Sequence, residues 1–347
     1  MNYPTIPPID TTCAQQAEAR QNILTKPAKS LGRLEEISIQ LAGMKASAFP
    51  DVQRKAVIVM AADHGVALEG VSAYPPEVTP QMVLNFLHGG AAINVLARQA
   101  GASVTIVDIG VASDFDPALP GLLHRKVAHG SRNMAKGPAM TRAEAEKALA
   151  EGMDVLALVA GAGLDLLATG DMGIGNTTPS AAIAAVLTGL PVRMLTGRGT
   201  GVDDAGLERK ITIIEQAIAV NQPDPHDALD VLCKVGGLEI AGLAGVMIAA
   251  AARRIPVVVD GFISTAAAMI AVGLVPDVRN YLFGGHKSVE IGHQAMLKHL
   301  GLVPLLDLDL RLGEGTGAAL AFHLIEASTR ILREMATFAE ASVSDKQ

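Results

Sequence analysis

Ala56-Val57-Ile58-Val59-Met60-Ala61-Ala62 decides how this chain folds, because the run is apolar at every position. A strand with one solvated face alternates apolar and polar residues, whereas a short uninterrupted apolar run is typical of a strand buried on both faces. We expect further strands of this kind at residues 103–109, 164–169, 256–260 and 302–306, and a strand-like run ends at Phe283-Gly284-Gly285.

Segments with helical character lie between these runs. Thr141 opens one of them, because Thr141 and Glu144 have the spacing of a capping box. We expect other helices over residues 13–48 (with breaks near Lys26-Pro27 and Leu31-Gly32), 78–100, 206–221, 237–253, 264–272, 288–300 and 316–339. Buried strands that alternate with helices predict an α/β fold, namely a Rossmann-like parallel sheet with helices on both faces.

The two ends of the chain predict a second, smaller unit. The last helix is expected to leave the sheet and to pack with the helices at the N-terminus. We therefore expect residues 1–48 and 319–347 to form a small helical domain, and residues 49–318 to form the Rossmann-like catalytic domain. A chain of 347 residues is long enough for one large and one small domain.

The overall composition excludes several classes of protein. A formal net charge of −7 and the absence of Trp argue against a nucleic-acid-binding protein. Cys13 and Cys233 are far apart in the sequence, as expected of reduced thiols. The N-terminus does not resemble a signal peptide, and apolar stretches such as 240–252 are shorter than the roughly 18 residues needed to span a bilayer. We therefore expect a cytoplasmic protein with no membrane contact.

One glycine-rich turn carries an isolated carboxylate. Glu314 lies between Gly313 and Gly315, after the apolar run at residues 302–312. Alternating glycines let the backbone bend sharply and approach a ligand closely, so this is either a turn with a solvated carboxylate or a turn that aims a base at a bound molecule. A second glycine turn at residues 170–178, also placed after an apolar run and before a helix, favours the base.

The second turn predicts a phosphate site. Gly173-Ile174-Gly175-Asn176-Thr177-Thr178 places backbone N–H groups, an amide and hydroxyls at the start of a helix, where anions bind. The turn lacks the Gly-Lys-Ser/Thr of a Walker loop, and Thr178 stands where the dinucleotide fingerprint has its third glycine. A purely structural turn explains this stretch, taken alone, about as well as a phosphate site does.

Other polar groups are expected at the same edge of the sheet, because open α/β sheets bind ligands beyond the carboxyl ends of their strands. A third glycine-dense loop at residues 196–201 contains Gly199. Lys210 follows this loop, and it is either a positive charge for the phosphate or part of a solvated helix face. Ser288 follows a strand-like run and either caps a helix or binds phosphate.

The spacing of the nine histidines predicts no metal site. There is no His-Glu-x-x-His pattern, and His286 and His293 have no Cys or Asp partner in register. The chain also lacks the Gly-x-Ser-x-Gly elbow of many serine hydrolases. We therefore expect neither a metal nor a cofactor.

Together, these segments resemble the nicotinate-nucleotide–dimethylbenzimidazole phosphoribosyltransferase family. Gly-Ile-Gly-Asn-Thr-Thr at residues 173–178 and Gly-Glu-Gly-Thr-Gly at residues 313–317 are the most specific matches. The remaining matches occur in order along nearly the whole chain, at residues 30–35, 62–66, 74–79, 236–241 and 260–262.

The resemblance implies a cytoplasmic homodimer that transfers the 5-phosphoribosyl group of nicotinate mononucleotide to 5,6-dimethylbenzimidazole with inversion. This pentosyltransferase reaction releases nicotinate and α-ribazole 5′-phosphate, which serves in assembly of the lower ligand of cobalamin. Glu314 matches the family's general base. The resemblance further assigns phosphate and ribose binding to Gly173, Gly175, Asn176, Thr177, Gly199, Lys210 and Ser288, and the benzimidazole pocket to Glu77, Met82, Asn85 and Leu312.

Position 171 departs from the family pattern, in which Glu is common. Asp171 keeps the negative charge, but its side chain is one methylene shorter and reaches less far. The resemblance therefore implies a supporting hydrogen bond for Asp171 and not a direct catalytic role.

Two other classes of protein remain open. One is a different nucleoside-processing Rossmann-like enzyme, such as a nucleoside phosphorylase or a dehydrogenase, although the incomplete glycine fingerprint argues against a dinucleotide. The other is a non-catalytic protein that binds a nucleotide and a benzimidazole without reaction. Such a protein has no need of a base in a bent glycine turn.

Overall fold

The computed structural model describes residues 1–344 and contains one seven-stranded parallel sheet. The strand order is β3-β2-β1-β4-β5-β6-β7, and β1 pairs in register with β2 on one side and β4 on the other, so that Lys55 lies opposite Ala102 and Leu166. The predicted α/β class with a parallel sheet is confirmed. The strands are β1 (Lys55–Ala62), β2 (Ala102–Gly110), β3 (Leu122–His124), β4 (Leu166–Met172), β5 (Val257–Val259), β6 (Leu282–His286) and β7 (Pro304–Leu306).

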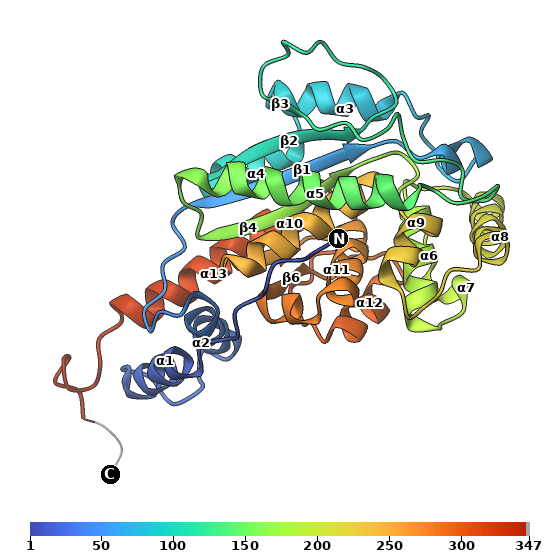
Figure 1. Cartoon of the computed structure of the whole chain (residues 1–347). Coiled ribbons are helices and arrows are strands. Elements are labelled where there is room, and N and C mark those ends of the chain that lie inside the picture. The colour runs from blue at the N-terminus through green and yellow to red at the C-terminus, as the bar shows by residue number, and fades with distance from the viewer. Residues whose placement is uncertain (345–347) are drawn as a thin grey trace.

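Helices cover both faces of the sheet (Figure 1). The α-helices are α1 (Thr11–Ile23), α2 (Arg33–Lys45), α3 (Val78–Leu87), α4 (Ala92–Ala100), α5 (Arg142–Val159), α6 (Thr177–Thr188), α7 (Val192–Leu195), α8 (Asp204–Asn221), α9 (Ala228–Val235), α10 (Leu238–Ala252), α11 (Phe262–Leu274), α12 (His293–Leu300) and α13 (Thr316–Glu334). Short 3₁₀ helices occur at Gly65–Glu69, Ala160–Ala162 and Pro276–Tyr281. Helix α4 lies on one face, where α13 packs against it, and α5, α10 and α11 pack together on the other face (Figure 1).

The core lies between the sheet and these helices. In β1 every residue from Ala56 to Ala62 is buried, as the uninterrupted apolar run predicts. Helix α10 is buried from Leu238 to Ala251, because it packs between the sheet, α5 and α11. Among residues 1–344, no helix combines the length and the apolar character needed to cross a bilayer.

Helices from the N-terminal and C-terminal segments of the chain lie together, beside the sheet. Helices α1 and α2 pack against the end of α13, away from the strands (Figure 1). A small apolar cluster of Ala17, Ala42 and Leu332 joins the three helices, while the first half of α13 packs on the sheet itself. The division into domains at 1–48 with 319–347 and at 49–318 remains a prediction, and its residues 345–347 lie outside the described range.

Several predicted helix boundaries are wrong. The segment 78–100 is two helices, because the chain turns at Gly89 (φ +75°) and the Asn94 side chain then bonds the Phe86 carbonyl and the Ala91 N–H. Helix α12 begins at His293 and not at residue 288, and α13 ends at Glu334 and not at residue 339. The short strand β3 and the helices α7 and α9 were not predicted.

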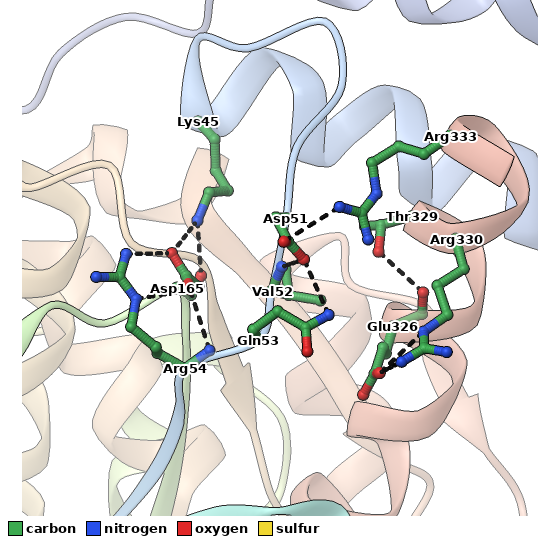
Figure 2. A network of polar contacts seen from close by, with 10 residues as sticks. All are labelled: Lys45, Asp51, Val52, Gln53, Arg54, Asp165, Glu326, Thr329, Arg330 and Arg333. Atoms are coloured by element: carbon green, nitrogen blue, oxygen red, sulfur yellow. Dashed lines mark hydrogen bonds and ion pairs between the residues drawn. The ribbon is translucent and has the colours of Figure 1, made fainter.

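An ion-pair network joins α2 to the amino edge of the sheet (Figure 2). Asp165, which directly precedes β4, accepts hydrogen bonds from the backbone N–H of Arg54 (3.0 Å), from Arg54 Nε (3.0 Å) and from Lys45 Nζ (3.0 Å). The Asp165 side chain is only 12% exposed. Burial alone would raise the pKa of Asp165, but the hydrogen bonds from Arg54 and Lys45 outweigh burial and lower it.

We expect Asp165→Asn to lower the free energy of unfolding by about 1–3 kcal/mol, because the amide cannot accept all four hydrogen bonds and leaves two cations without their partner. Denaturant unfolding at pH 7 measures the change. Glu208→Gln is the matched control, because Glu208 pairs with Arg193 on the solvated surface and its loss should leave the midpoint unchanged. Equal midpoints for Asp165→Asn and the wild type would contradict the expected role of this network.

Candidate active site

A cavity of about 680 Å³ lies at the carboxyl edge of the sheet, beyond the ends of β4, β5 and β6. The chain reverses its direction of strand addition between β1 and β4, and such switch points are where open α/β sheets bind ligands. The two glycine turns therefore meet at one cavity. Predicted site residues in its lining are Met82, Asp171, Gly173, Asn176, Thr177, Gly199, Ser288, Leu312 and Glu314.

Glu314 lines the cavity from a turn with left-handed backbone at three successive residues. The φ angles are +83° at Gly313, +63° at Glu314 and +94° at Gly315. Glycine adopts such angles freely, but a residue with a Cβ is strained by roughly 1–2 kcal/mol. Strained residues of this kind cluster at functional sites, where the surrounding structure holds them in place.

The backbone of this turn packs directly on β4. A Cβ on Gly170 would overlap the carbonyl oxygen of Glu314, so the turn can approach β4 only because this position is glycine. The Glu314 carboxylate in turn lies against the N-terminus of α4, where Ile93 N donates to Oε2 over 3.4 Å. The break between α3 and α4 thus supplies a helix terminus, and its positive end faces a carboxylate.

The environment of Glu314 suits a general base. Burial raises the pKa of Glu314 to about 7; the hydrogen bond from Ile93 opposes the increase, and the charge of Asp260 adds to it. A base is most effective when its pKa lies near the working pH, because it is then both deprotonated and strongly basic. The carboxylate could accept a proton from a ligand in the cavity.

Asp171, in β4, supports the glycine turn at residues 173–178, which is called the phosphate turn here after its predicted role. Asn176 Nδ2 donates to Asp171 Oδ2 over 2.9 Å, whereas Oδ1 has no hydrogen-bond partner among residues 1–344. Burial raises the pKa of Asp171 well above its ordinary value, and the charges of Asp260, Glu239 and Glu314 add to the increase. The bond to Asn176 is of the supporting kind that the resemblance implies, and the supporting role of Asp171 remains a prediction.

Lys210 lies beneath the phosphate turn and not on a solvated helix face. Its side chain is 1% exposed, and Nζ donates to Thr177 Oγ1 over 2.6 Å and to the Gly197 carbonyl over 3.4 Å. Burial lowers the pKa of Lys210 to about 8, against the charge of Glu290, which raises it. Lys210 thus orients Thr177, which lines the cavity, although Lys210 itself is not part of the lining.

Three other predicted residues differ in their relation to the cavity. Ser288 lines the cavity, and its backbone N–H donates to His293 Nδ1 over 2.9 Å. Gly175 adopts φ +90° inside the phosphate turn but does not line the cavity. On α3, Met82 shares one helix face with Val78, and both line the cavity.

Glu77 and Asn85 are not among the residues that line the cavity. Glu77 is exposed at the start of α3, and the Asn85 amide lies against Met82 Sδ at 3.9 Å. Their assignment to a benzimidazole pocket remains a prediction. Leu312, by contrast, lines the cavity and is 58% exposed at its rim.

Arg311, Glu290 and His286 are among the polar residues of the lining that were not predicted as site residues. Arg311 Nη1 donates to the Gly199 carbonyl over 3.1 Å and so joins two loops across the cavity. Glu290 Oε2 and both ring nitrogens of His286 are buried without hydrogen-bond partners among residues 1–344. His286 ends β6, and a polar residue at the carboxyl end of a parallel strand is a signal that could have identified it.

Within the described residues, no group of three or more His, Cys, Asp or Glu side chains could hold a metal ion. Cys13 and Cys233 are both free thiols. Burial raises the pKa of Cys233 to about 11, so this group stays protonated near neutral pH.

The fold and the cavity define a Rossmann-like α/β protein with a ligand site at the carboxyl edge of its sheet. A family profile described as phosphoribosyltransferase matches residues 6–343. The nicotinate-nucleotide–dimethylbenzimidazole phosphoribosyltransferase of Chloroflexus aggregans is 59% identical, over 99% of this chain and 97% of that relative. The protein of the same name from Geobacter sulfurreducens is 59% identical, over 97% and 96% of the two chains.

A solved structure leads to the same family. The crystal structure of nicotinate-nucleotide–dimethylbenzimidazole phosphoribosyltransferase from Thermus thermophilus matches with a TM-score of 0.92 and 49% identity. The match covers 97% of this chain and 100% of that structure. The chain therefore belongs to the nicotinate-nucleotide–dimethylbenzimidazole phosphoribosyltransferase family.

The strain at Glu314 can be measured directly. We expect Glu314→Gly to be more stable than Glu314→Ala by about 1 kcal/mol, because both lose the carboxylate but only glycine relaxes the left-handed backbone. Thermal unfolding of the two variants measures the difference. Gly315→Ala is the control in the other direction, because it adds a Cβ to a left-handed position of the same turn. That Cβ would lie 2.8 Å from Val57 Cγ1, so this change should lower the unfolding temperature. An Ala variant at least as stable as the Gly variant would contradict backbone strain at position 314.

Proposed function

We propose that this chain transfers the phosphoribosyl group of nicotinate mononucleotide to 5,6-dimethylbenzimidazole, with Glu314 as the general base. The observation that carries the proposal is the Glu314 carboxylate, which lines a cavity shared with the phosphate turn and has a pKa of about 7. Membership of the family supports the choice of substrates.

The chemistry fits a site with one base. The pyridine nitrogen of nicotinate mononucleotide is already cationic, so cleavage of its bond to C1′ of the ribose releases neutral pyridine nitrogen without a general acid. The incoming benzimidazole attacks C1′ through one ring nitrogen while its other nitrogen carries a proton. Glu314 accepts that proton as the new bond forms, which prevents a cationic product and contributes a factor of roughly 10²–10⁴ to the rate.

The geometry of displacement sets the configuration of the product. Attack on the face of the ribose opposite the departing nicotinate inverts C1′, so a β-nucleotide gives an α-product. A negative carboxylate near the ribose also stabilises the positive charge that develops on it in the transition state. No charged leaving group has to be neutralised, so we propose that the reaction needs neither a metal nor a cofactor.

We place the phosphate at the turn of residues 173–178, because Gly173, Asn176 and Thr177 of this turn line the cavity. Lys210 supplies positive charge through its contact with Thr177, and Ser288 lies in the same lining. The flat benzimidazole fits the apolar side of the cavity, near Met82 and Leu312. An apolar slot discriminates between related bases by only about 1–3 kcal/mol per methyl-sized group, so other benzimidazoles are expected to be accepted.

We further propose a cytoplasmic homodimer. Several apolar side chains in segments close to the cavity lining are largely exposed, including Met194 (57%), Ile291 (60%) and Leu308 (55%). The loops that carry them are neighbours, since Gly292 packs on Leu195 and Val289 N donates to the Leu310 carbonyl. Clustered apolar groups of this kind are typical of surfaces that a partner covers.

Product analysis tests the proposed reaction. We expect the purified protein, incubated with nicotinate mononucleotide and 5,6-dimethylbenzimidazole in EDTA, to release nicotinate and α-ribazole 5′-phosphate in equal amounts. Glu314→Gln should bind nicotinate mononucleotide normally in calorimetry and lose roughly 10²–10⁴-fold in turnover. The surface variant Glu208→Gln is the control and should match the wild type.

Other results of the product analysis would each indicate a different function for the protein. Nicotinate without the riboside would indicate hydrolysis or a different acceptor base. Binding of both substrates without any product, with Mg²⁺ restored, would indicate the non-catalytic binding protein. Near-normal turnover of Glu314→Gln would exclude Glu314 as the base.

Sedimentation equilibrium tests the homodimer. We expect twice the mass of the chain for the wild type and a single-chain mass for the double variant Ile291→Glu/Leu308→Glu, because two buried charges would have no partners. Val95→Glu, at an exposed apolar position on α4, is the control and should remain dimeric. A wild type with the mass of one chain at micromolar concentration would contradict the dimer.

A further inference from the structure

Asp260, which directly follows β5, is hydrogen-bonded to the turn that carries Glu314. Its side chain is 1% exposed, so no solvent competes for the carboxylate. Oδ2 accepts the N–H of Gly315 over 3.1 Å, and Oδ1 accepts the N–H of Ala318 over 2.9 Å. Both oxygens thus bind the backbone on the C-terminal side of Glu314.

These two bonds replace an ordinary helix cap. Gly315 is the N-cap residue of α13 and has no side chain to accept the free N–H groups of the first turn. Asp260 provides the missing acceptors from another element, and its negative charge faces the positive end of the α13 dipole. One residue therefore fixes both the start of α13 and the turn before it.

The titratable groups near Glu314 and Asp171 come from several elements. Asp171 lies near the end of β4, Asp260 follows β5, His286 ends β6, and Glu239 lies in the first turn of α10. His286 Nε2 lies 3.8 Å from Asp260 Oδ1. From α4, the neutral N–H of Ile93 faces the Glu314 carboxylate. Asp260 is the group whose charge acts most directly on Glu314.

We propose that Asp260 is a positioning residue for this reaction: its two carboxylate oxygens hold the Glu314 turn against β4, and they place a negative charge beside that turn. The inference rests on the proposed role of Glu314. It assigns Asp260 no contact with the substrate, because Asp260 does not line the cavity.

The two effects of Asp260 are separable, because one is geometric and the other electrostatic. Loss of the backbone bonds lets the turn relax from its strained conformation, and a misplaced base reduces the turnover number. Loss of the Asp260 charge removes its repulsion of the Glu314 carboxylate, which lowers the pKa of Glu314. Glu314 would then lose its proton at lower pH and would be a weaker base. A purely structural residue would show the first effect without the second.

The test is the pH dependence of kcat/KM for the full-length enzyme with both substrates. Asp260→Asn removes the charge and keeps the shape. We expect its acid limb to move to lower pH by roughly half a unit or more, and its kcat to fall by about ten- to a hundredfold. Substrate ionisation affects wild type and variant equally, so the difference between the two profiles reports on the enzyme.

Three further variants make the test specific. Asp260→Glu keeps the charge, so its acid limb should stay at the wild-type pH even where kcat is reduced. Asp108→Asn is the matched control, because Asp108 is likewise buried in β2, accepts a backbone N–H from Val111 and lies outside the cavity. In Asp260→Asn, the amide NH₂ group points at a backbone N–H donor and could prevent folding. If that variant does not fold, Asp260→Ser takes its place, because its hydroxyl oxygen can accept a hydrogen bond from a backbone N–H.

The outcomes for Asp260 and for Glu314 are distinguishable. An acid limb for Asp260→Asn or Asp260→Ser that superimposes on the wild-type limb, while Glu314→Gln is inactive, would overturn the role of Asp260 and leave the role of Glu314 intact. An active Glu314→Gln would instead overturn the proposed base, whatever the Asp260 variants show. A shift that Asp260→Glu restores would establish the charge of Asp260 as its cause.

Discussion

The backbone contact between Gly170 of β4 and the carbonyl of Glu314 positions the rest of the site. It seats the strained turn at residues 313–315 on the sheet, so the carboxylate is held by the most rigid part of the fold. From the next position of the same strand, Asp171 reaches the phosphate turn through Asn176. One strand thus fixes both the expected base and the expected phosphate site, and the distance between the two is set by the spacing of residues along β4.

The cavity concentrates carboxylates with few cations to balance them. Asp171, Asp260 and Glu314 lie at the ends of neighbouring elements, and each is buried. Burial raises the pKa of all three groups, and the charge of Asp260 adds to the increase at Asp171 and at Glu314. The free N–H groups of helix termini oppose the increase at Asp260 and at Glu314. This arrangement favours a ligand that brings positive charge and a proton to donate. A cationic nucleotide and a benzimidazole with an N–H supply both.

The sequence alone predicts those parts of the molecule that depend on local pattern. The apolar run at residues 56–62 indicates a doubly covered parallel sheet, and the turns around Gly173 and Glu314 indicate its ligand edge. Asp260 was not predicted, because its importance comes from N–H groups 55 and 58 residues away. The break near Gly89 was missed for a related reason: the helical pattern continues through it, and only the Asn94 side chain and the contact of Ile93 with Glu314 show what the break provides.

The most direct measurement of the central claim is a titration of the Glu314 carboxyl group itself. With ¹³C-labelled glutamate, the carboxyl resonance of Glu314 can be identified by its absence in Glu314→Gln and followed from about pH 3 to about pH 9 in the free enzyme, a range that spans the ordinary and the raised pKa. A midpoint of about 7 is the predicted result, because burial and the charge of Asp260 favour the protonated form. A midpoint near the ordinary value of 4.5 would contradict a carboxylate poised for base catalysis at neutral pH.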